Sequence, residues 1–379
     1  MLKIGITGQP GFVGTHLFNT LGLSPDEFTR VPFEDNYFQS SGKLESFVKE
    51  CDAIVHLAAV NRHNDPEVIY HTNIGLVTQL IDAMEKTNSR PHVLFSSSTQ
   101  EERDNIYGKS KREGRELLEK WANRNNARFT GLIIPNVFGS FGNPYYNSVV
   151  ATFCHQISHN ETPKIEVDGE IKLIYVSELV NEIIIRIELM QQISYDKPTV
   201  ELVHVPNTSQ IKVSELLKLL QEIKTNYFEK GEIPSINNPF ERNLFNTFLT
   251  YIDHSTFFPF KLKLNTDQRG SFVETVKLNS GGQVSFSTTV PGVTRGNHFH
   301  TRKAERFAVI KGKALIELRR IGTSEVLSFE LDGNEPSFVD MPIWYTHNIK
   351  NIGNEELYTI FWISEHFSPD DPDTFFENV

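Results

Sequence analysis

Short apolar runs alternate with amphipathic stretches along the first half of the chain. Four runs of aliphatic and β-branched residues, bounded by turn-forming residues, are typical of strands buried on both faces: residues 2–7, 53–57, 92–96 and 130–134. Between them, apolar positions recur with helical spacing over residues 74–86, and a heavily charged helix is predicted over residues 107–124. This alternation predicts an α/β domain with a doubly wound parallel sheet of the Rossmann type.

The pattern changes after about residue 240. From residue 258 onward, short runs alternate polar and apolar positions, as at residues 314–319 and 357–363, and glycines separate the runs. A two-residue period interrupted by turns predicts an antiparallel all-β domain, either a sandwich or a small barrel. We therefore predict an α/β domain over residues 1–245 and an all-β domain over residues 246–379.

Composition excludes several classes of protein. The 48 acidic and 37 basic side chains give a net charge of −11, which argues against general nucleic-acid binding. No apolar run approaches the roughly 20 residues of a membrane-spanning helix, so no membrane insertion is expected. The chain opens directly on a strand pattern without a leader, and Cys51 and Cys154 are too few for a disulfide framework. A cytoplasmic protein is expected.

A glycine-rich turn follows the first predicted strand. Gly8, Gly11 and Gly14 are spaced three residues apart and open a helix. This spacing allows a tight turn and a close approach of the backbone to a pyrophosphate. We expect the loop, with Phe12 and Val13, to bind a dinucleotide; an ordinary strand–helix turn is the alternative.

The second strand, expected over residues 27–31, bears on the choice of cofactor. A carboxylate at the end of this strand would bind the ribose 2′-hydroxyl of NAD, whereas the chain has Arg30 there. Because an arginine suits a 2′-phosphate, we predict NADPH as the cofactor. The alternative is that Arg30 is a surface arginine.

Residues suited to carbonyl chemistry follow. The consecutive serines Ser96, Ser97 and Ser98 end a predicted strand, and Tyr107 and Lys111 project from one face of the next helix. A free tyrosine has a pKa near 10. The lysine ammonium and an oxidised nicotinamide ring are expected to lower it, while a serine hydroxyl holds the substrate carbonyl.

These motifs resemble the short-chain dehydrogenase/reductases, specifically the extended branch that acts on nucleotide sugars. The resemblance covers about residues 1–240 and is also carried by residues 52–59, Asn73 and residues 135–139. It implies a cofactor lying along Leu57 and Ala58, a nicotinamide ribose at Lys111, a proton donor at Tyr107, a carbonyl-orienting hydroxyl at Ser98 and a substrate contact at Asn136. Ser97 remains an alternative to Ser98.

One departure from this branch narrows the reaction. Its sugar dehydratases carry an Asp-Glu pair directly after the serine or threonine, and this chain has Thr99 and Gln100 instead. Glu101 and Glu102 follow one position too late. We therefore expect reduction or epimerisation and not the elimination of water.

Three histidines and one glutamate in the second half have the spacing of a metal site. His298 and His300 are two residues apart on a predicted strand, so they face the same side, and Glu305 and His347 follow. Three imidazoles and one carboxylate suit a divalent metal, and zinc is the expected ion, with room for water or a substrate oxygen. The alternative is a set of polar residues that satisfy one another.

The two motifs that contain these residues resemble those of the cupin superfamily, with Trp344 where a glycine is usual. The segments 267–274 and 292–298 resemble the nucleotide-sugar 3,5-epimerases of rhamnose synthesis. That resemblance implies that Arg269 and Arg295 bind the phosphates of the substrate and that His298 abstracts a proton.

The chain also departs from those metal-independent epimerases. They carry a lysine where this chain has Glu305, and they lack a partner like His300. His298 is therefore either a base or a metal ligand. A metal would take over the stabilisation of an enolate.

Over its full length the chain resembles bifunctional capsular-polysaccharide enzymes that convert a UDP-2-acetamido-2,6-dideoxy-4-ketohexose on the path to UDP-N-acetyl-L-fucosamine. The resemblance implies C3 epimerisation in the cupin domain and then NADPH-dependent C4 reduction in the Rossmann domain, giving a 6-deoxy-talosamine sugar. We expect a homodimer that binds a UDP-sugar. Two alternatives remain: a single-activity reductase or epimerase with a structural, dimerising cupin, and a non-catalytic dinucleotide sensor.

Overall fold

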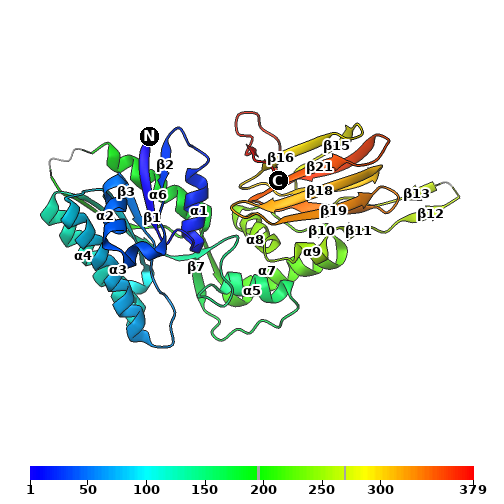
Figure 1. The fold of residues 1–379 in the computed structure, drawn as a ribbon. Coiled ribbons are helices and arrows are strands. Elements are labelled where there is room, and N and C mark those ends of the chain that lie inside the picture. Colours follow the sequence, from blue (N-terminus) through cyan, green and yellow to red (C-terminus); the bar gives the residue numbers. More distant parts are fainter. Residues whose placement is uncertain (194–196, 269) are drawn as a thin grey trace. The chain divides into compact units, whose positions relative to one another are not determined.

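The computed structural model describes residues 1–193, 197–268 and 270–379 and contains two compact units (Figure 1). The first unit comprises residues 1–149 and 169–212, and the second comprises residues 150–168 and 213–379. None of the described helices is long and apolar enough to cross a membrane.

A parallel sheet of six strands forms the centre of the first unit, in the order β2-β1-β3-β4-β5-β8. Every neighbouring pair in this sheet is parallel. The strands are β1 (Leu2–Thr7), β2 (Phe28–Val31), β3 (Ala53–His56), β4 (His92–Ser98), β5 (Arg128–Ile134) and β8 (Thr199–His204). A smaller sheet, β6-β7-β9, contains β6 (Asn136–Phe138), β7 (Glu170–Tyr175) and β9 (Ser209–Lys212).

Helices cover both faces of the six-stranded sheet. One apolar cluster contains residues of α2 (Ser41–Glu50), α3 (Pro66–Thr87) and α4 (Ile106–Asn125), and the other contains residues of α1 (Phe12–Leu21) and α6 (Val176–Gln191). Consecutive strand residues divide between the two clusters, as Ile54 and Val55 do. Because strand side chains alternate in direction, this division shows a sheet buried on both faces. The predicted doubly wound Rossmann fold is confirmed.

Two antiparallel five-stranded sheets form most of the second unit (Figure 1). Their orders are β11-β20-β17-β22-β15 and β19-β18-β21-β16-β23. The strands are β11 (Phe260–Lys261), β15 (Gln283–Thr289), β16 (Thr294–Phe299), β17 (Glu305–Lys311), β18 (Lys313–Arg320), β19 (Val326–Asp332), β20 (Ser337–Met341), β21 (Tyr345–Asn351), β22 (Leu357–Ile363) and β23 (Phe375–Phe376). Side chains from both sheets share one apolar core, such as Ala308 and Ile316, so the predicted cupin-like β domain is confirmed.

The division into units differs from the predicted boundary at residue 245. Helices α5 (Val149–Ser158) and α7 (Val213–Lys224) belong to the second unit, together with α8 (Pro239–Leu249) and α9 (His254–Phe257). A buried polar network accounts for part of this grouping. Tyr227 donates a hydrogen bond to Asp340, which also accepts two from Arg306 at 2.8 and 2.9 Å. Arg306 in turn donates to the carbonyl of Gly231.

Candidate active sites

The glycine loop connects β1 to α1 at the carboxyl end of the parallel sheet. Gly8 has a φ of +71°, and a Cβ there would lie 2.8 Å from the backbone nitrogen of Ala58. A Cβ at Gly14 would lie 2.4 Å from the carbonyl oxygen of Gly8. The structure therefore brings the loop, with the half-buried Phe12 and Val13 at its end, against the residues that follow β3. This is the close backbone packing that a dinucleotide-binding turn requires.

Arg30 is not brought to the glycine loop. It pairs with Ile4 in the parallel ladder, whereas the loop begins only after Thr7. Its guanidinium lies 4.2 Å from the centre of the Phe18 ring and donates a hydrogen bond of 3.2 Å to the Phe18 carbonyl. The side chain thus packs along α1.

The serine run presents two different faces. Ser96 accepts a hydrogen bond of 3.4 Å from the ammonium of Lys111, and Ser98 shares this face because strand side chains alternate. Ser97 is buried on the opposite face and donates a hydrogen bond to Glu101. This geometry favours Ser98 over Ser97 as the carbonyl-orienting residue, and that role stays a prediction.

Lys111 and Tyr107 lie one turn apart on α4. Lys111 is buried, with its ammonium 4.4 Å from the centre of the Phe95 ring, and burial lowers its pKa to about 7. Burial, with a smaller contribution from Tyr146, raises the pKa of Tyr107 to about 12. In the protein without cofactor, loss of hydration destabilises the phenolate, so the predicted lowering of the Tyr107 pKa depends on the oxidised nicotinamide ring and stays a prediction. Tyr107 is protonated at neutral pH, as a proton donor must be.

Asn73 ties the loop after β3 to the first turns of α4. Its side-chain oxygen accepts a hydrogen bond of 2.7 Å from the Val60 nitrogen, and its amide donates 2.9 Å to the Val60 carbonyl. The same amide group donates 3.0 Å to Ser110. The hydroxyl of Ser110 donates to the carbonyl of Tyr107. Asn73 therefore fixes the loop after β3 relative to α4, the helix that carries Tyr107.

In the sequence, Glu101 stands out only because it follows the position of the dehydratase acids. The structure shows that it forms an ion pair with Arg115. Glu101 is buried in the 3-10 helix η2 (Thr99–Glu102) and forms an ion pair with Arg115 of α4, with N–O distances of 3.0 to 3.2 Å. Both oxygens of the carboxylate are thus occupied. This pairing supports the prediction that no water elimination occurs, because Glu101 is held as a structural anion next to Ser97.

Replacement of Arg115 tests this interpretation. We expect Arg115→Met to lower the free energy of unfolding by about 3 kcal/mol, because it leaves the Glu101 carboxylate buried without its counter-ion. The matched control is Arg124→Met, which breaks the exposed pair with Glu85 and should cost at most about 1 kcal/mol. Urea denaturation followed by circular dichroism measures both values. Equal costs for the two variants would contradict the assigned role of the Glu101 pair.

Asn136 occupies β6, outside the six-stranded sheet. Its side chain is exposed and donates a hydrogen bond of 3.3 Å to the carbonyl of Lys172 in β7. Among the described contacts, none joins Asn136 to Ser98 or Tyr107. Its role in substrate binding stays a prediction.

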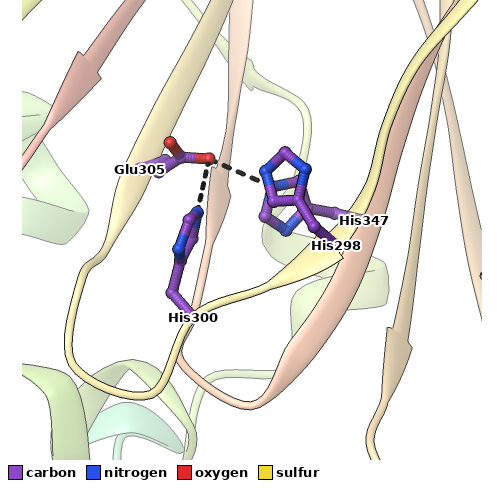
Figure 2. A group of neighbouring side chains, drawn as sticks. All are labelled: His298, His300, Glu305 and His347. Carbon is purple, nitrogen blue, oxygen red and sulfur yellow. Dashed lines mark ion pairs between the residues drawn. The ribbon is translucent and has the colours of Figure 1, made fainter. Parts of the chain in front are cut away.

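The second site lies within the β domain, where four side chains converge (Figure 2). His298 comes from β16, His300 from the residue after it, Glu305 from the start of β17 and His347 from β21. One ligand atom from each residue lies within 4.8 Å of those of the others. Glu305 Oε2 is 3.0 Å from His347 Nε2 and 3.4 Å from His300 Nε2. The structure thus brings together the four residues that the sequence singles out, and their role as metal ligands stays a prediction.

The donor set fits a divalent metal. Nδ1 of His347 lies 3.2 Å from the Tyr345 carbonyl, and Nδ1 of His300 contacts the Asp373 carbonyl, so in both rings Nε2 is the atom turned toward Glu305. These two Nε2 atoms are buried and face Glu305 Oε2 in ion-pair contacts, without a hydrogen bond of good geometry among the described residues. A bound metal would satisfy all three atoms at once, which favours a metal site over a self-satisfied polar cluster.

The charge states of the cluster also suit a metal. Burial lowers the pKa of His298 to about 4, so its imidazole is neutral at pH 7. Burial raises the pKa of Glu305, but its contacts with His300 and His347 outweigh this and hold that pKa well below its usual range. A neutral His298 and an ionised Glu305 are forms that bind a metal. Burial lowers the pKa of His300, but contacts with Glu305 and the Asp373 carbonyl outweigh this and raise that pKa, so a metal would displace a proton there.

Of the two arginines expected to bind phosphate, Arg295 lies on β16 with an exposed side chain. It donates hydrogen bonds of 3.1 Å to the Thr289 hydroxyl and to the Thr288 carbonyl. Arg269 lies outside the described residues. Both assignments stay predictions.

Comparison with known families matches both parts of the chain. The NAD dependent epimerase/dehydratase family matches residues 4–194, and the polysaccharide biosynthesis C-terminal domain matches residues 265–375. The first match contains the glycine loop and the Tyr107–Lys111 pair, and the second contains all four residues of the histidine–glutamate cluster.

Individual relatives match either the whole chain or a large part of it. The UDP-2-acetamido-2,6-beta-L-arabino-hexul-4-ose reductase of Pseudomonas aeruginosa is 33% identical over 379 residues, covering 99% of this chain and 98% of the relative. The crystal structure of the capsular polysaccharide assembling protein CapF from Staphylococcus aureus matches with a TM-score of 0.62 and 36% identity over 100% of both chains. UDP-glucose 4-epimerase from Thermotoga maritima matches 66% of this chain and 98% of its own, with a TM-score of 0.55 and 19% identity, which bears on the fold alone.

Proposed function

The chain belongs to the NAD dependent epimerase/dehydratase family and carries a polysaccharide biosynthesis C-terminal domain, and on this premise we propose that it is a bifunctional nucleotide-sugar enzyme. Its substrate is a UDP-linked 2-acetamido-2,6-dideoxy-4-ketohexose. The β domain epimerises C3, and the Rossmann unit then reduces the C4 ketone, giving a 6-deoxy-talosamine precursor for a capsular polysaccharide. One observation carries the proposal: the first unit contains the glycine loop with Ser98, Tyr107 and Lys111, and the second unit contains the histidine–glutamate cluster.

The order of the two steps follows from the chemistry of the sugar. A proton on C3 is acidic only while C4 is a ketone, because the electron pair released at C3 needs that carbonyl as its sink. Reduction at C4 removes the sink. Epimerisation must therefore come first, and a 4-keto sugar must be the substrate of both units.

In the Rossmann unit, the glycine loop would hold NADPH, which would supply a hydride for C4. Ser98 orients the C4 carbonyl, and the phenol of Tyr107 donates a proton to the oxygen as the alkoxide forms. Lys111 holds the nicotinamide ribose. The high pKa of Tyr107 supports this direction of proton transfer, because the residue enters the reaction protonated.

In the β domain, His298, His300, Glu305 and His347 would hold one divalent ion, with zinc as our choice. Such an ion supplies a Lewis acid that stabilises negative charge on the C4 oxygen while C3 is deprotonated. His298 lies inside the cluster, 4.7 Å from the ring centre of His347, and would either complete the ligand set or take the C3 proton as the base. His298 is also the half-buried member, so it marks the accessible side of the cluster.

The proposal is tested with the 4-keto UDP-sugar in deuterated water, with and without NADPH, followed by NMR. Without NADPH we expect deuterium at C3 and no change in oxidation state. With NADPH we expect a C4 alcohol and one NADPH consumed per sugar. Reduction without any deuterium at C3 would favour the alternative of a single-activity reductase with a structural cupin. The burial of three members of the cluster is the observation that supports this alternative.

A homodimer is part of the proposal. The edge strand β15 exposes Val284 and Phe286, at 52% and 71% of their surface. Exposed apolar side chains on an edge strand offer a pairing surface. Sedimentation equilibrium measures the mass, and a monomer at micromolar concentration would contradict this part.

The choice of NADPH has its own test at Arg30. Its exposed guanidinium packs on Phe18 of α1 through one neutral hydrogen bond and one ring contact, so binding a 2′-phosphate requires the side chain to leave these contacts. We expect Arg30→Ala to lower kcat/KM for NADPH about tenfold or more, since a charge-assisted hydrogen bond contributes about 1.5–3 kcal/mol. The value for NADH serves as the internal control and should not change. An unaltered ratio of the two values would exclude Arg30 from phosphate binding.

A further inference from the structure

The last residues of the chain enclose the loop that follows β16. Asp373 is buried and its carboxylate accepts four hydrogen bonds from this loop. Thr301 donates two of them, from its nitrogen at 3.0 Å and from its hydroxyl at 2.6 Å. The nitrogen of Arg302 donates the third at 3.0 Å. The fourth comes from the nitrogen of Lys303 at 3.2 Å. One side chain thus fixes three consecutive residues between His300 and Glu305.

Asp373 also contacts a proposed metal ligand directly. Its backbone carbonyl accepts a hydrogen bond of 2.5 Å from Nδ1 of His300. Because Nδ1 carries the proton, Nε2 of His300 has a free lone pair, and this is the atom 3.4 Å from Glu305. The backbone of Asp373 has a φ of +40°, so the carboxylate bonds and the carbonyl bond come from one sharply bent residue.

The strand that follows continues the contact along β16. In the antiparallel pairing of β23 with β16, Phe376 lies opposite His298 and Phe375 lies opposite Phe299. The ring of Phe299 stacks on Phe375 at 5.4 Å and on Trp344 at 5.5 Å. The residue between the two histidine ligands is therefore packed from both sides, and one side is supplied by the end of the chain.

Other contacts of the same segment are more exposed. Arg302 pairs with Glu365 at 3.0 Å and with Asp371 at 2.7 Å, and the Asp371 side chain is 69% exposed. Exposed ion pairs contribute little to stability. Asp373, which is buried and bonded from both its side chain and its backbone, is the residue that fixes the loop.

We propose that Asp373 is a positioning residue of the metal centre, through which the C-terminal segment 371–376 sets the orientation of His300 and the affinity for the ion. This inference rests on the metal proposed above. Hydrogen bonds to the second ring nitrogen of a metal-ligating histidine fix its tautomer and ring orientation, and their loss typically weakens metal binding about 10–100-fold. The proposal adds a determinant of metal affinity that lies about seventy residues along the chain from the ligand it orients.

The test uses the full chain and zinc. In Asp373→Asn, an amide N–H group faces backbone N–H donors, so we expect zinc affinity to fall about 10–100-fold. The control Asp371→Asn, which removes only the exposed pair with Arg302, should bind zinc like the unaltered protein. A second pair of variants changes the protein less, in case Asp373→Asn does not fold. Thr301→Val should weaken zinc binding several-fold, whereas Thr301→Ser keeps the hydroxyl and should bind zinc like the unaltered protein.

Two measurements separate positioning from general stability. Competition with a chromophoric chelator gives the zinc dissociation constant, and the absorption spectrum of the cobalt-substituted protein reports the geometry around the ion. Thermal unfolding of each variant with and without zinc gives the rise in Tm that the metal causes. A positioning role reduces this rise in Asp373→Asn, whereas a merely structural role lowers both Tm values equally and leaves the rise intact.

The outcomes also separate this inference from the proposed function. Unaltered protein that binds no zinc would overturn the metal centre and the positioning role with it. Zinc bound by the unaltered protein and equally tightly by Asp373→Asn would overturn the positioning role alone. Weaker binding with an altered cobalt spectrum in Asp373→Asn, and normal values in Asp371→Asn, supports the proposal.

Discussion

Tyr107→Phe is expected to abolish NADPH oxidation while exchange of the C3 proton continues at its normal rate. The substitution removes the phenol hydroxyl that would protonate the C4 oxygen, and loss of a general acid lowers the rate about 10²–10⁴-fold. Exchange should persist because the histidine–glutamate cluster belongs to the other unit. Stopped assays at 340 nm and NMR in deuterated water measure the two activities on one preparation.

The matched control is Tyr70→Phe. Tyr70 lies on α3 and its hydroxyl donates a hydrogen bond of 2.6 Å to Glu113, so both activities should remain. Loss of C3 exchange in a Tyr107→Phe protein that is still folded by circular dichroism would contradict the assignment of the two steps to separate units.

His347→Gln is expected to remove the metal and C3 exchange together. His347 is buried at the centre of the cluster, and its Nε2 is 3.0 Å from Glu305, so an amide cannot replace the imidazole without leaving the carboxylate poorly paired. A ligand present at 100 to 1,000 times its dissociation constant stabilises a protein by about 2.7–4.1 kcal/mol, and the variant should lose that amount. Elemental analysis, deuterium exchange and thermal unfolding measure the three effects.

The control for this variant is His366→Gln, at an exposed position of the same unit. It should keep its metal, its exchange activity and its melting temperature. A chelator should reproduce the effects of His347→Gln in the unaltered protein. Metal-free protein with full stability and full exchange would show that the epimerase chemistry does not need the ion.

The strongly periodic elements could be predicted from the sequence because local patterns determine them. Strand β1 occupies its predicted residues 2–7, and the predicted helix over 107–124 is α4, one residue longer at each end. The histidine–glutamate cluster was predictable for a related reason. Alternation along one strand already places His298 and His300 on the same side, and the motif spacing supplies the other two ligands.

The positions that the sequence did not reveal depend on register and on long-range contacts. Arg30 is on the predicted strand, but only the pairing with β1 shows that it lies opposite Ile4 and beside Phe18. Glu101 was noticed, yet nothing local indicates that Arg115 occupies its carboxylate. The bonds of Asp373 to the loop after His300 likewise join segments with no shared local pattern.

The interleaving of the two units has a consequence for synthesis on the ribosome. Residues 150–168 emerge before the first unit is complete, but they belong to the second unit, which requires residues 213–379. The apolar face of α5, including Phe153 and Ile157, can therefore pack within its unit only after residue 213 has emerged, and the unit is complete only with the last of the 211 residues that follow residue 168. At about 5–20 residues per second, synthesis of these 211 residues takes roughly 10–40 s. Early in that interval the nascent chain exposes the apolar face of α5, and any single cut in the gene would divide at least one of the two units.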